Sequence, residues 1–174
     1  PPGPGGGTRY NGLLVTWAPW EFPRAPVFAE LPEASKQALW VPGNINWAGP
    51  RDFPAFIGRA TGFALLVETG IVISQPGEYE FALVSDDGAA LEVLGAEMIA
   101  NAGHSAGASS LLDAQVGRMY LGAGTWPLAV TYFSVGCSYC SSLVLKWRPP
   151  GAAALVPVPA ERMEFFKPPP PPPP

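Results

Sequence analysis

The stretch SQPGEYEFALVSDDGAAL, residues 74–91, decides the fold of this 174-residue chain. It opens with a Pro-Gly turn, continues with alternating apolar side chains and ends in the acidic turn DDG before a second apolar run. A period of two is typical of a strand with one buried face. The pattern therefore predicts a strand with Tyr79, Phe81 and Leu83 facing a core, followed by a turn at Asp86-Asp87.

Similar short apolar runs continue on both sides of this stretch, each bounded by Gly, Pro or other turn residues. Strands are predicted at 13–17, 63–68, 71–74, 78–83, 90–94, 98–99, 116–121, 128–133 and 143–147, with a short edge strand within 161–166. Such even spacing indicates an antiparallel β-sandwich or barrel. Residues 18–61 carry seven prolines and are predicted to form a long loop, with room for a turn or two of helix after Pro32.

Composition narrows the function classes. Apolar residues make up 48% of the chain and charged residues 14%, with 20 glycines, 23 prolines and a net charge of −4. This favours one turn-rich, all-β domain without the basic footprint that nucleic acid requires. No stretch approaches the roughly 20 apolar residues of a membrane span. We therefore expect neither a nucleic-acid partner nor a membrane span.

Proline-rich segments flank the body of the chain. The predicted organisation is a Pro/Gly-rich linker at 1–9, a β-sandwich at 10–166 and a polyproline II segment at 167–174. A proline run has fixed φ and no N–H donors, so it is predicted to stand as a stiff, solvated rod. This rod is interpreted as a site of assembly or glycosylation, formed by Pro168, Pro169, Pro170, Pro171, Pro172, Pro173 and Pro174.

Several landmarks in order point to a known family. They are Gly12-Leu13-Leu14, residues 74–81 and 85–91 of the opening stretch, YLGAG at 120–124, VTYF at 130–133 and LVLKW at 143–147. Over residues 10–166 the chain resembles the PA-fourteen domain family, which is named after anthrax protective antigen and occurs in yeast flocculins, epithelial adhesins and many glycosidases. The resemblance implies a β-sandwich of two antiparallel sheets. With its proline runs, the chain is also similar to hydroxyproline-rich glycoproteins of cell walls and flagellar surfaces.

Asp86 and Asp87 are candidate calcium and carbohydrate ligands, because the resemblance to flocculin-like members implies that such a pair holds calcium. Adjacent carboxylates can serve one hard cation only if the backbone is bent, for instance by a cis peptide. The alternative is that both are turn formers. In lectin members a later loop supplies an Asn ligand, but here residues 134–140 contain no Asn, Asp or Gln. Ser134, the backbone carbonyls of that loop and Tyr139, which could stack on a sugar ring, remain as candidate contacts.

Cys137 and Cys140, the only cysteines, lie in the same loop. A four-residue turn brings its end Cα atoms within about 7 Å, so a disulfide between them is predicted, and with it export. Two reduced thiols at a hairpin tip are the alternative. His104 is the only histidine, which argues against zinc and against a catalytic triad.

Other side chains give no catalytic pattern. Glu78 and Glu80 are predicted to face solvent, with no glycosidase pair among them and Glu92 or Glu97. Among the six tryptophans, Trp147 is predicted to be core, while Trp20, Trp40 and Trp47 are expected to form a minor hydrophobic cluster or a contact surface.

The first functional hypothesis is a non-enzymatic, extracellular module of a proline-rich glycoprotein that assembles into a surface fibre or matrix. In it the proline rod docks on another copy or on attached sugar. The alternative is a calcium-dependent, lectin-like adhesion domain that binds glycans at Asp86, Asp87 and the loop from Ser134 to Ser142. The missing Asn favours assembly.

Overall fold

The computed structural model describes residues 8–101 and 115–167, and these ranges contain strands and short 3-10 turns but no α-helix. The larger sheet comprises β1 (Thr8–Asn11), β2 (Leu13–Pro19), β3 (Gln37–Val41), β5 (Phe63–Ile73), β7 (Ala89–Val93), β8 (Ala96–Asn101), β10 (Gly124–Ser134) and β13 (Met163–Lys167). The smaller sheet comprises β4 (Asn46–Trp47), β6 (Gly77–Asp86), β9 (Gln115–Leu121), β11 (Ser142–Arg148) and β12 (Val156–Pro157). All pairings are antiparallel.

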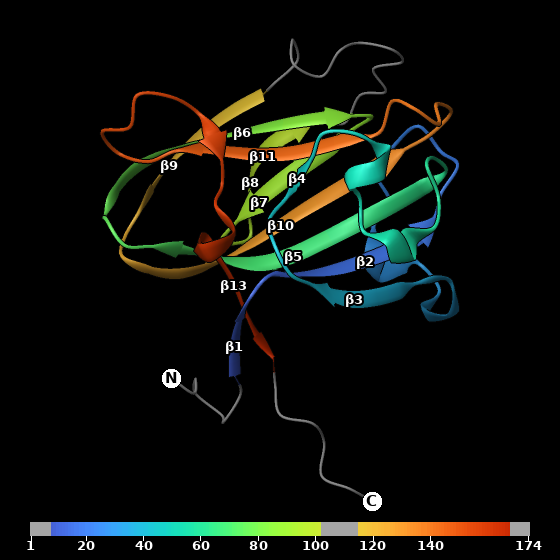
Figure 1. Ribbon diagram of the computed structural model, residues 1–174, viewed down its shortest axis with the longest axis horizontal. Helices are drawn as coiled ribbons and strands as arrows, with labels where there is room; N and C mark the ends of the chain where they lie inside the picture. The colour runs from blue at the N-terminus through green and yellow to red at the C-terminus, as the bar shows by residue number, and fades with distance from the viewer. Residues whose placement is uncertain (1–7, 102–114, 168–174) are drawn as a thin grey trace, which may run out of the picture.

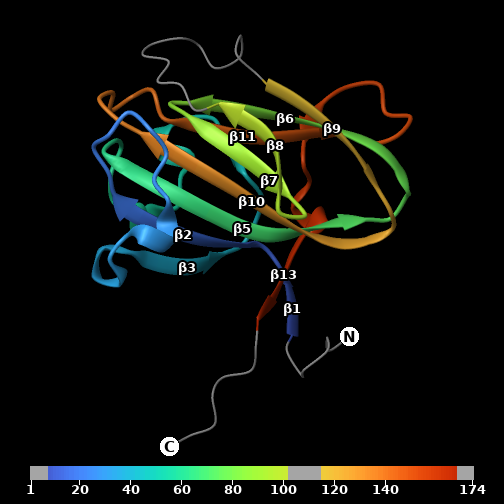
Figure 2. The same cartoon turned by 180° about the vertical axis from the view of Figure 1, so that it is seen from behind.

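The two sheets pack face to face with the core between them (Figures 1 and 2). In the larger sheet β5 and β10 pair along their whole length, from Gly124 opposite Ile73 to Ser134 opposite Phe63. The smaller sheet places β6 between β9 and β11. The core takes alternate side chains from both sheets, among them Val15, Phe63, Leu65, Val67, Tyr79, Phe81, Leu83, Leu91, Val130, Tyr132, Leu143, Leu145 and Trp147. The predicted all-β antiparallel sandwich is confirmed, with the alternation at Tyr79, Phe81 and Leu83.

The structure corrects the sequence prediction at two places. The runs 63–68 and 71–74 form one strand, β5, because Thr69 and Gly70 stay paired with β10. The predicted long loop at 18–61 contains β3, β4 and 3-10 turns, including η2 (Glu33–Ser35) directly after Pro32. The chain there is ordered by pairing of β3 with β2 and of β4 with β11.

Trp20, Trp40 and Trp47 do not form one cluster. Trp47 is buried in the core beside Phe53, with the ring centroids 5.2 Å apart. Trp20 packs edge-on against Phe22, and its indole N–H donates to the carbonyl oxygen of Arg24 at 2.7 Å. Trp40 is exposed on β3. The expectation of a shared surface is wrong because β3 and β4 join different sheets.

Strands β1 and β13 run side by side away from the sandwich, so both ends of the described chain leave it at one place (Figure 1). The strands take in Thr8, Arg9 and Lys167, which the sequence assigned to the flanking segments. Residues 1–7 and the proline run Pro168–Pro174 lie outside the described residues. Within the described ranges, no helix is long and apolar enough to cross a membrane.

Candidate functional site

The acidic turn lies where β6 ends and β7 begins. Asp86 is the last residue of β6, and the peptide bond that joins it to Asp87 is cis. Asp86 is 7% exposed and Asp87 4% exposed, so the carboxylates are recessed at the end of the sandwich.

Tyr132 of β10 reaches this turn from inside the core. Its phenol O–H donates to the backbone carbonyl oxygen of Asp86 at 2.5 Å, and the backbone N–H of Phe133 donates to the carbonyl oxygen of Gly88 at 3.0 Å. Burial raises the pKa of Tyr132 well above its ordinary value, so the phenol stays neutral and remains a donor. The turn is thereby fixed against the larger sheet.

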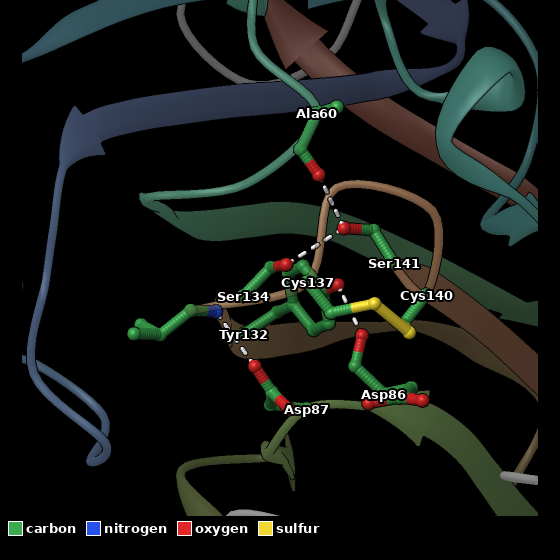
Figure 3. Close-up of a disulfide and its surroundings, with 9 residues drawn as sticks. Ala60, Asp86, Asp87, Tyr132, Ser134, Cys137, Cys140 and Ser141 are labelled. Carbon is green, nitrogen blue, oxygen red and sulfur yellow. Dashed lines mark hydrogen bonds between the residues drawn. A yellow bond between two sulfur atoms is a disulfide. The ribbon is translucent and has the colours of Figure 1, made fainter. Parts of the chain in front are cut away.

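Asp87 ties the turn to the loop between β10 and β11, residues 135–141. The backbone N–H of Val135, the first residue of this loop, donates to Oδ2 of Asp87 at 2.6 Å. A charge-assisted bond of this kind is stronger than one between neutral groups. The acidic pair and the loop therefore form one structural unit, as Figure 3 shows.

A pair of buried serines holds the base of the same loop. The hydroxyl of Ser141 donates to the carbonyl oxygen of Ala60 at 2.6 Å, and the hydroxyls of Ser134 and Ser141 are 2.6 Å apart. A serine has one proton to donate, so Ser134 is the donor to Ser141. Ser134, predicted as a sugar contact, is thus an internal anchor whose hydroxyl is already engaged.

Cys137 and Cys140 form the predicted disulfide across the tip of the loop. Their Sγ atoms are bonded at 1.99 Å, with the Cα atoms 5.5 Å apart. The bond closes the turn that carries Ser138 and Tyr139 (Figure 3 shows the bond). The alternative of two reduced thiols is not the state observed.

Tyr139 projects into solvent at this end of the sandwich, with 83% of its surface exposed. It borders an open hollow of about 580 Å³, which is also lined by Arg51, Arg59 and Ala60. Ala60 lies on one side of the serine pair and the two aspartates on the other (Figure 3). Tyr139 therefore lies on the loop to which Asp87 is bonded, but Tyr139 and the acidic pair do not line the same pocket.

Asp86 and Asp87 offer hard carboxylate oxygens, which are ligands of the type that calcium takes. The pair supplies only part of the six to eight oxygens that calcium takes. Within residues 8–101 and 115–167 no group of three or more His, Cys, Asp or Glu side chains could hold a metal. Backbone carbonyls, water or ligand hydroxyls would have to complete the coordination.

The surroundings of Glu80 differ from the sequence prediction. It lies on the outer face of the smaller sheet, as alternation requires, yet its side chain is buried by two arginines. Oε2 of Glu80 accepts from Nε of Arg118 at 2.8 Å and from Nη2 of Arg148 at 3.0 Å. The hydrogen bond from Arg118, more than any other contact, lowers the pKa of Glu80. Glu78 remains exposed as predicted.

The sequence missed the residues that assemble this end of the sandwich. Tyr132 was predicted only as part of a strand, while Ser141, Ala60, Arg51 and Arg59 carried no signal. They come from two segments far apart in the sequence, 51–60 and 132–141, and only the fold brings these segments together. His104, the remaining residue considered for chemistry, lies outside the described residues.

Comparison with known proteins gives a clear result at the level of structure alone. No family model matches the sequence, and no curated protein sequence matches it. The PA14 domain of the antifreeze protein MpAFP is similar with a TM-score of 0.66 and 8% identity, covering 90% of this chain and 92% of that one.

Two adhesin domains are similar to the same degree. The A domain of epithelial adhesin 9 from Candida glabrata, solved with Galβ1-3GlcNAc, has a TM-score of 0.63 and 12% identity, covering 92% of this chain and 91% of that one. The PA14 sugar-binding domain of an RTX adhesin has a TM-score of 0.60 and 17% identity, covering 88% and 97%.

A longer protein also contains this shape. An anti-sigma factor domain-containing protein matches with a TM-score of 0.61 and 15% identity, but the likeness covers only 48% of that chain. The present chain therefore spans about half of that structure. Two antiparallel sheets, the acidic turn at their end and these structural likenesses together show that this chain has the fold of a PA14 domain.

Proposed function

We propose that this domain binds carbohydrate, in the manner of an adhesion module, at the end of the sandwich formed by the Asp86-Asp87 turn and the loop 135–141. The fold supports this proposal, because the similar structures include a sugar-binding domain of an adhesin and an adhesin domain in complex with a disaccharide. The particular sugars are ligands of those proteins. For this chain we propose only the same chemical class of ligand, carbohydrate.

One observation carries the proposal: Asp87 accepts the N–H of Val135 at 2.6 Å. This bond fastens the recessed carboxylates to the loop that presents Tyr139 to solvent. Carboxylates and an exposed aromatic ring at one end of the domain suit a sugar, because carboxylates accept from its hydroxyls and a ring covers its apolar C–H face. The disulfide and the serine pair hold this loop in shape before any ligand arrives, which reduces the ordering cost of binding.

Calcium is part of the proposal. Asp86 and Asp87 would hold the ion, with the remaining oxygens from backbone, water and the sugar itself. The ion would supply a positive centre to which sugar hydroxyl oxygens can bind. The loop between β10 and β11 contributes no carboxylate or amide side chain, so calcium affinity should be lower than in a site with a third side-chain ligand.

We further propose a non-enzymatic role at the cell surface or outside the cell. The disulfide supports an oxidising compartment. The first hypothesis from the sequence, assembly into a fibre or matrix of a hydroxyproline-rich glycoprotein, remains a prediction, because Pro168–Pro174 lie outside the described residues. The comparisons favour the alternative from the sequence, carbohydrate binding.

The proposal is tested by a glycan array probed with the full chain in calcium and in excess chelator. We expect binding to a subset of glycans, with Galβ1-3GlcNAc, Galβ1-4GlcNAc and lactose included among those tested. Tyr139→Ala should weaken binding about tenfold or more, because a stacked aromatic contact is a typical hot spot.

The control is Tyr120→Ala, which removes an exposed tyrosine from β9 of the smaller sheet and should leave binding unchanged. Failure of the native chain to bind any glycan, or equal loss with both variants, would overturn the proposal. Retained folding of each variant is checked by its melting temperature.

A further inference from the structure

A row of stacked aromatic rings lies on the surface of the larger sheet, away from the acidic turn. Phe165 of β13 stacks with Trp40 of β3, at 3.8 Å between centroids, and with Tyr10 of β1, at 5.5 Å. Trp40 remains 37% exposed and Tyr10 46% exposed. Single exposed hydrophobic residues are common on protein surfaces, but three stacked rings form a contiguous apolar patch. Such a patch is typical of an interaction surface.

Two rings of this row, Trp40 and Phe165, line a groove across the outer face of the larger sheet. The groove has a volume of about 320 Å³, and its lining includes Trp40, Phe165, Gly70, Trp126 and Pro127. β5 pairs with β13 on one side and with β10 on the other, so Gly70 lies on the floor of the groove between these two strands. A neighbouring hollow of about 380 Å³ shares Glu68 with it and continues over the same face.

The floor of the groove requires glycine at position 70. A Cβ atom at Gly70 would lie 2.6 Å from Cγ2 of Thr125 and 2.7 Å from the carbonyl oxygen of Glu164, so only glycine fits between the flanking strands. Trp126 is fixed, because its indole N–H donates to the carbonyl oxygen of Gly122 at 2.9 Å. In the part of the chain that the structure describes, the indole N–H of Trp40 donates to no acceptor, so it is available to a ligand.

These features match one class of ligand, a polyproline II helix. Such helices dock on grooves lined by flat aromatic rings, and their stiffness lowers the ordering cost of binding. A proline residue has a carbonyl oxygen that accepts a hydrogen bond but no N–H that donates one. A groove whose indole N–H has no acceptor is therefore complementary to a proline run. The chain itself carries this ligand as Pro168–Pro174, directly after β13.

We propose that this groove binds the proline run Pro168–Pro174 of a second copy of the chain. The run would span about 22 Å at about 3.1 Å per residue. β13 leads away from the sandwich and ends at Lys167 (Figure 1). A stiff proline run that begins there would reach the groove of a neighbour more readily than it would fold back onto its own. This proposal is independent of carbohydrate binding.

The test measures two quantities on the full chain. Fluorescence anisotropy follows binding of a labelled heptaproline peptide, with a Gly-Ser peptide of equal length as the flexible control. Sedimentation velocity over a concentration series follows self-association. The variants are Trp40→Ala, Trp40→Phe, the tail variant P169G/P171G/P173G, and Phe22→Ala, which removes an exposed aromatic outside the groove.

We expect the native chain to self-associate and to bind heptaproline but not the Gly-Ser peptide. Trp40→Ala should weaken peptide binding about tenfold or more, and Trp40→Phe, which keeps the ring but loses the N–H, should lie between. Phe22→Ala should behave as native. The tail variant should bind the peptide yet stay monomeric.

Three results would overturn the proposal. The first is heptaproline binding that is absent or unaffected by Trp40→Ala. The second is self-association that survives in the tail variant. The third is a monomeric native chain that binds the peptide, which would assign the groove to a proline-rich segment of another protein.

Discussion

Tyr132 shows at the scale of one residue how the core shapes the candidate site. Its ring is buried against Phe53 and Phe63, and its hydroxyl ends at the backbone of Asp86. The sequence predicted the strand that contains Tyr132 from its apolar pattern. It could not predict the hydrogen bond, because that bond joins residues 46 positions apart through the packing of two sheets.

Tyr132→Phe is expected to lower the free energy of unfolding by about 1–2 kcal/mol, because a buried carbonyl oxygen loses this donor while the ring is retained. Urea denaturation measures the change. Tyr79→Phe is the matched control: its hydroxyl donates to the carbonyl oxygen of Gln75 at 2.8 Å, at a partly exposed position where water can replace it. A cost for Tyr132→Phe no larger than that for Tyr79→Phe would contradict the role given to this bond.

At the scale of the element, strands from different parts of the chain are joined by charged groups. Glu80 on β6 bridges Arg118 on β9 and Arg148 on β11, so one carboxylate links three neighbouring strands. Alternation placed Glu80 correctly on the outer face. It could not show the burial, because the arginines that cover Glu80 are 38 and 68 positions away.

Glu80→Gln should lower the urea midpoint of unfolding at pH 7. In acid the variant and the native protein should have the same midpoint. The pKa of Glu80 is lowered in the folded state, so its contribution is full above the unfolded pKa of about 4.3 and is lost as pH falls through the folded pKa. The midpoints of native and variant should therefore converge at low pH. Glu78→Gln, at an exposed neighbour on the same face, is the control. A gap between native and Glu80→Gln that is constant with pH would rule out the ion pairs as its source.

The loop between β10 and β11 should contain no free thiol in the native protein. Alkylation without reductant is expected to add no mass, whereas alkylation after reduction should modify both Cys137 and Cys140, which are disulfide-bonded here. Mass spectrometry of the intact chain reads both states. Two modified cysteines without reductant would contradict the disulfide and the export that it supports.

The whole molecule is a sandwich with two specialised places: the acidic turn and disulfide loop at one end, and the aromatic groove on the larger sheet. The sequence predicted the sandwich because strand periodicity and turn residues are local. It predicted the acidic turn at Asp86-Asp87 and the disulfide because the residues of each are close in sequence. It could not locate the groove, since Tyr10, Trp40 and Phe165 meet only through pairing of β1 with β13 and of β2 with β3.

Calcium should raise the melting temperature of the native chain, because a ligand that binds only the folded state stabilises it, by about 2.7 kcal/mol at a hundredfold excess over Kd. Asp87→Asn keeps an oxygen for the N–H of Val135 but removes the charge, so it should fold and lose most of the calcium response. Asp86→Ala with Asp87→Ala should lose all of it. A native chain that does not respond to calcium would leave the pair with the turn-forming role alone.

The most direct measurement is a crystal structure of the full chain grown with calcium and the glycan that binds most tightly on the array. The account predicts that the sugar lies at the end of the sandwich, in contact with the Asp86-Asp87 turn or the loop that carries Tyr139. A sugar bound elsewhere on the domain, or a chain for which no glycan ligand is found, would contradict it.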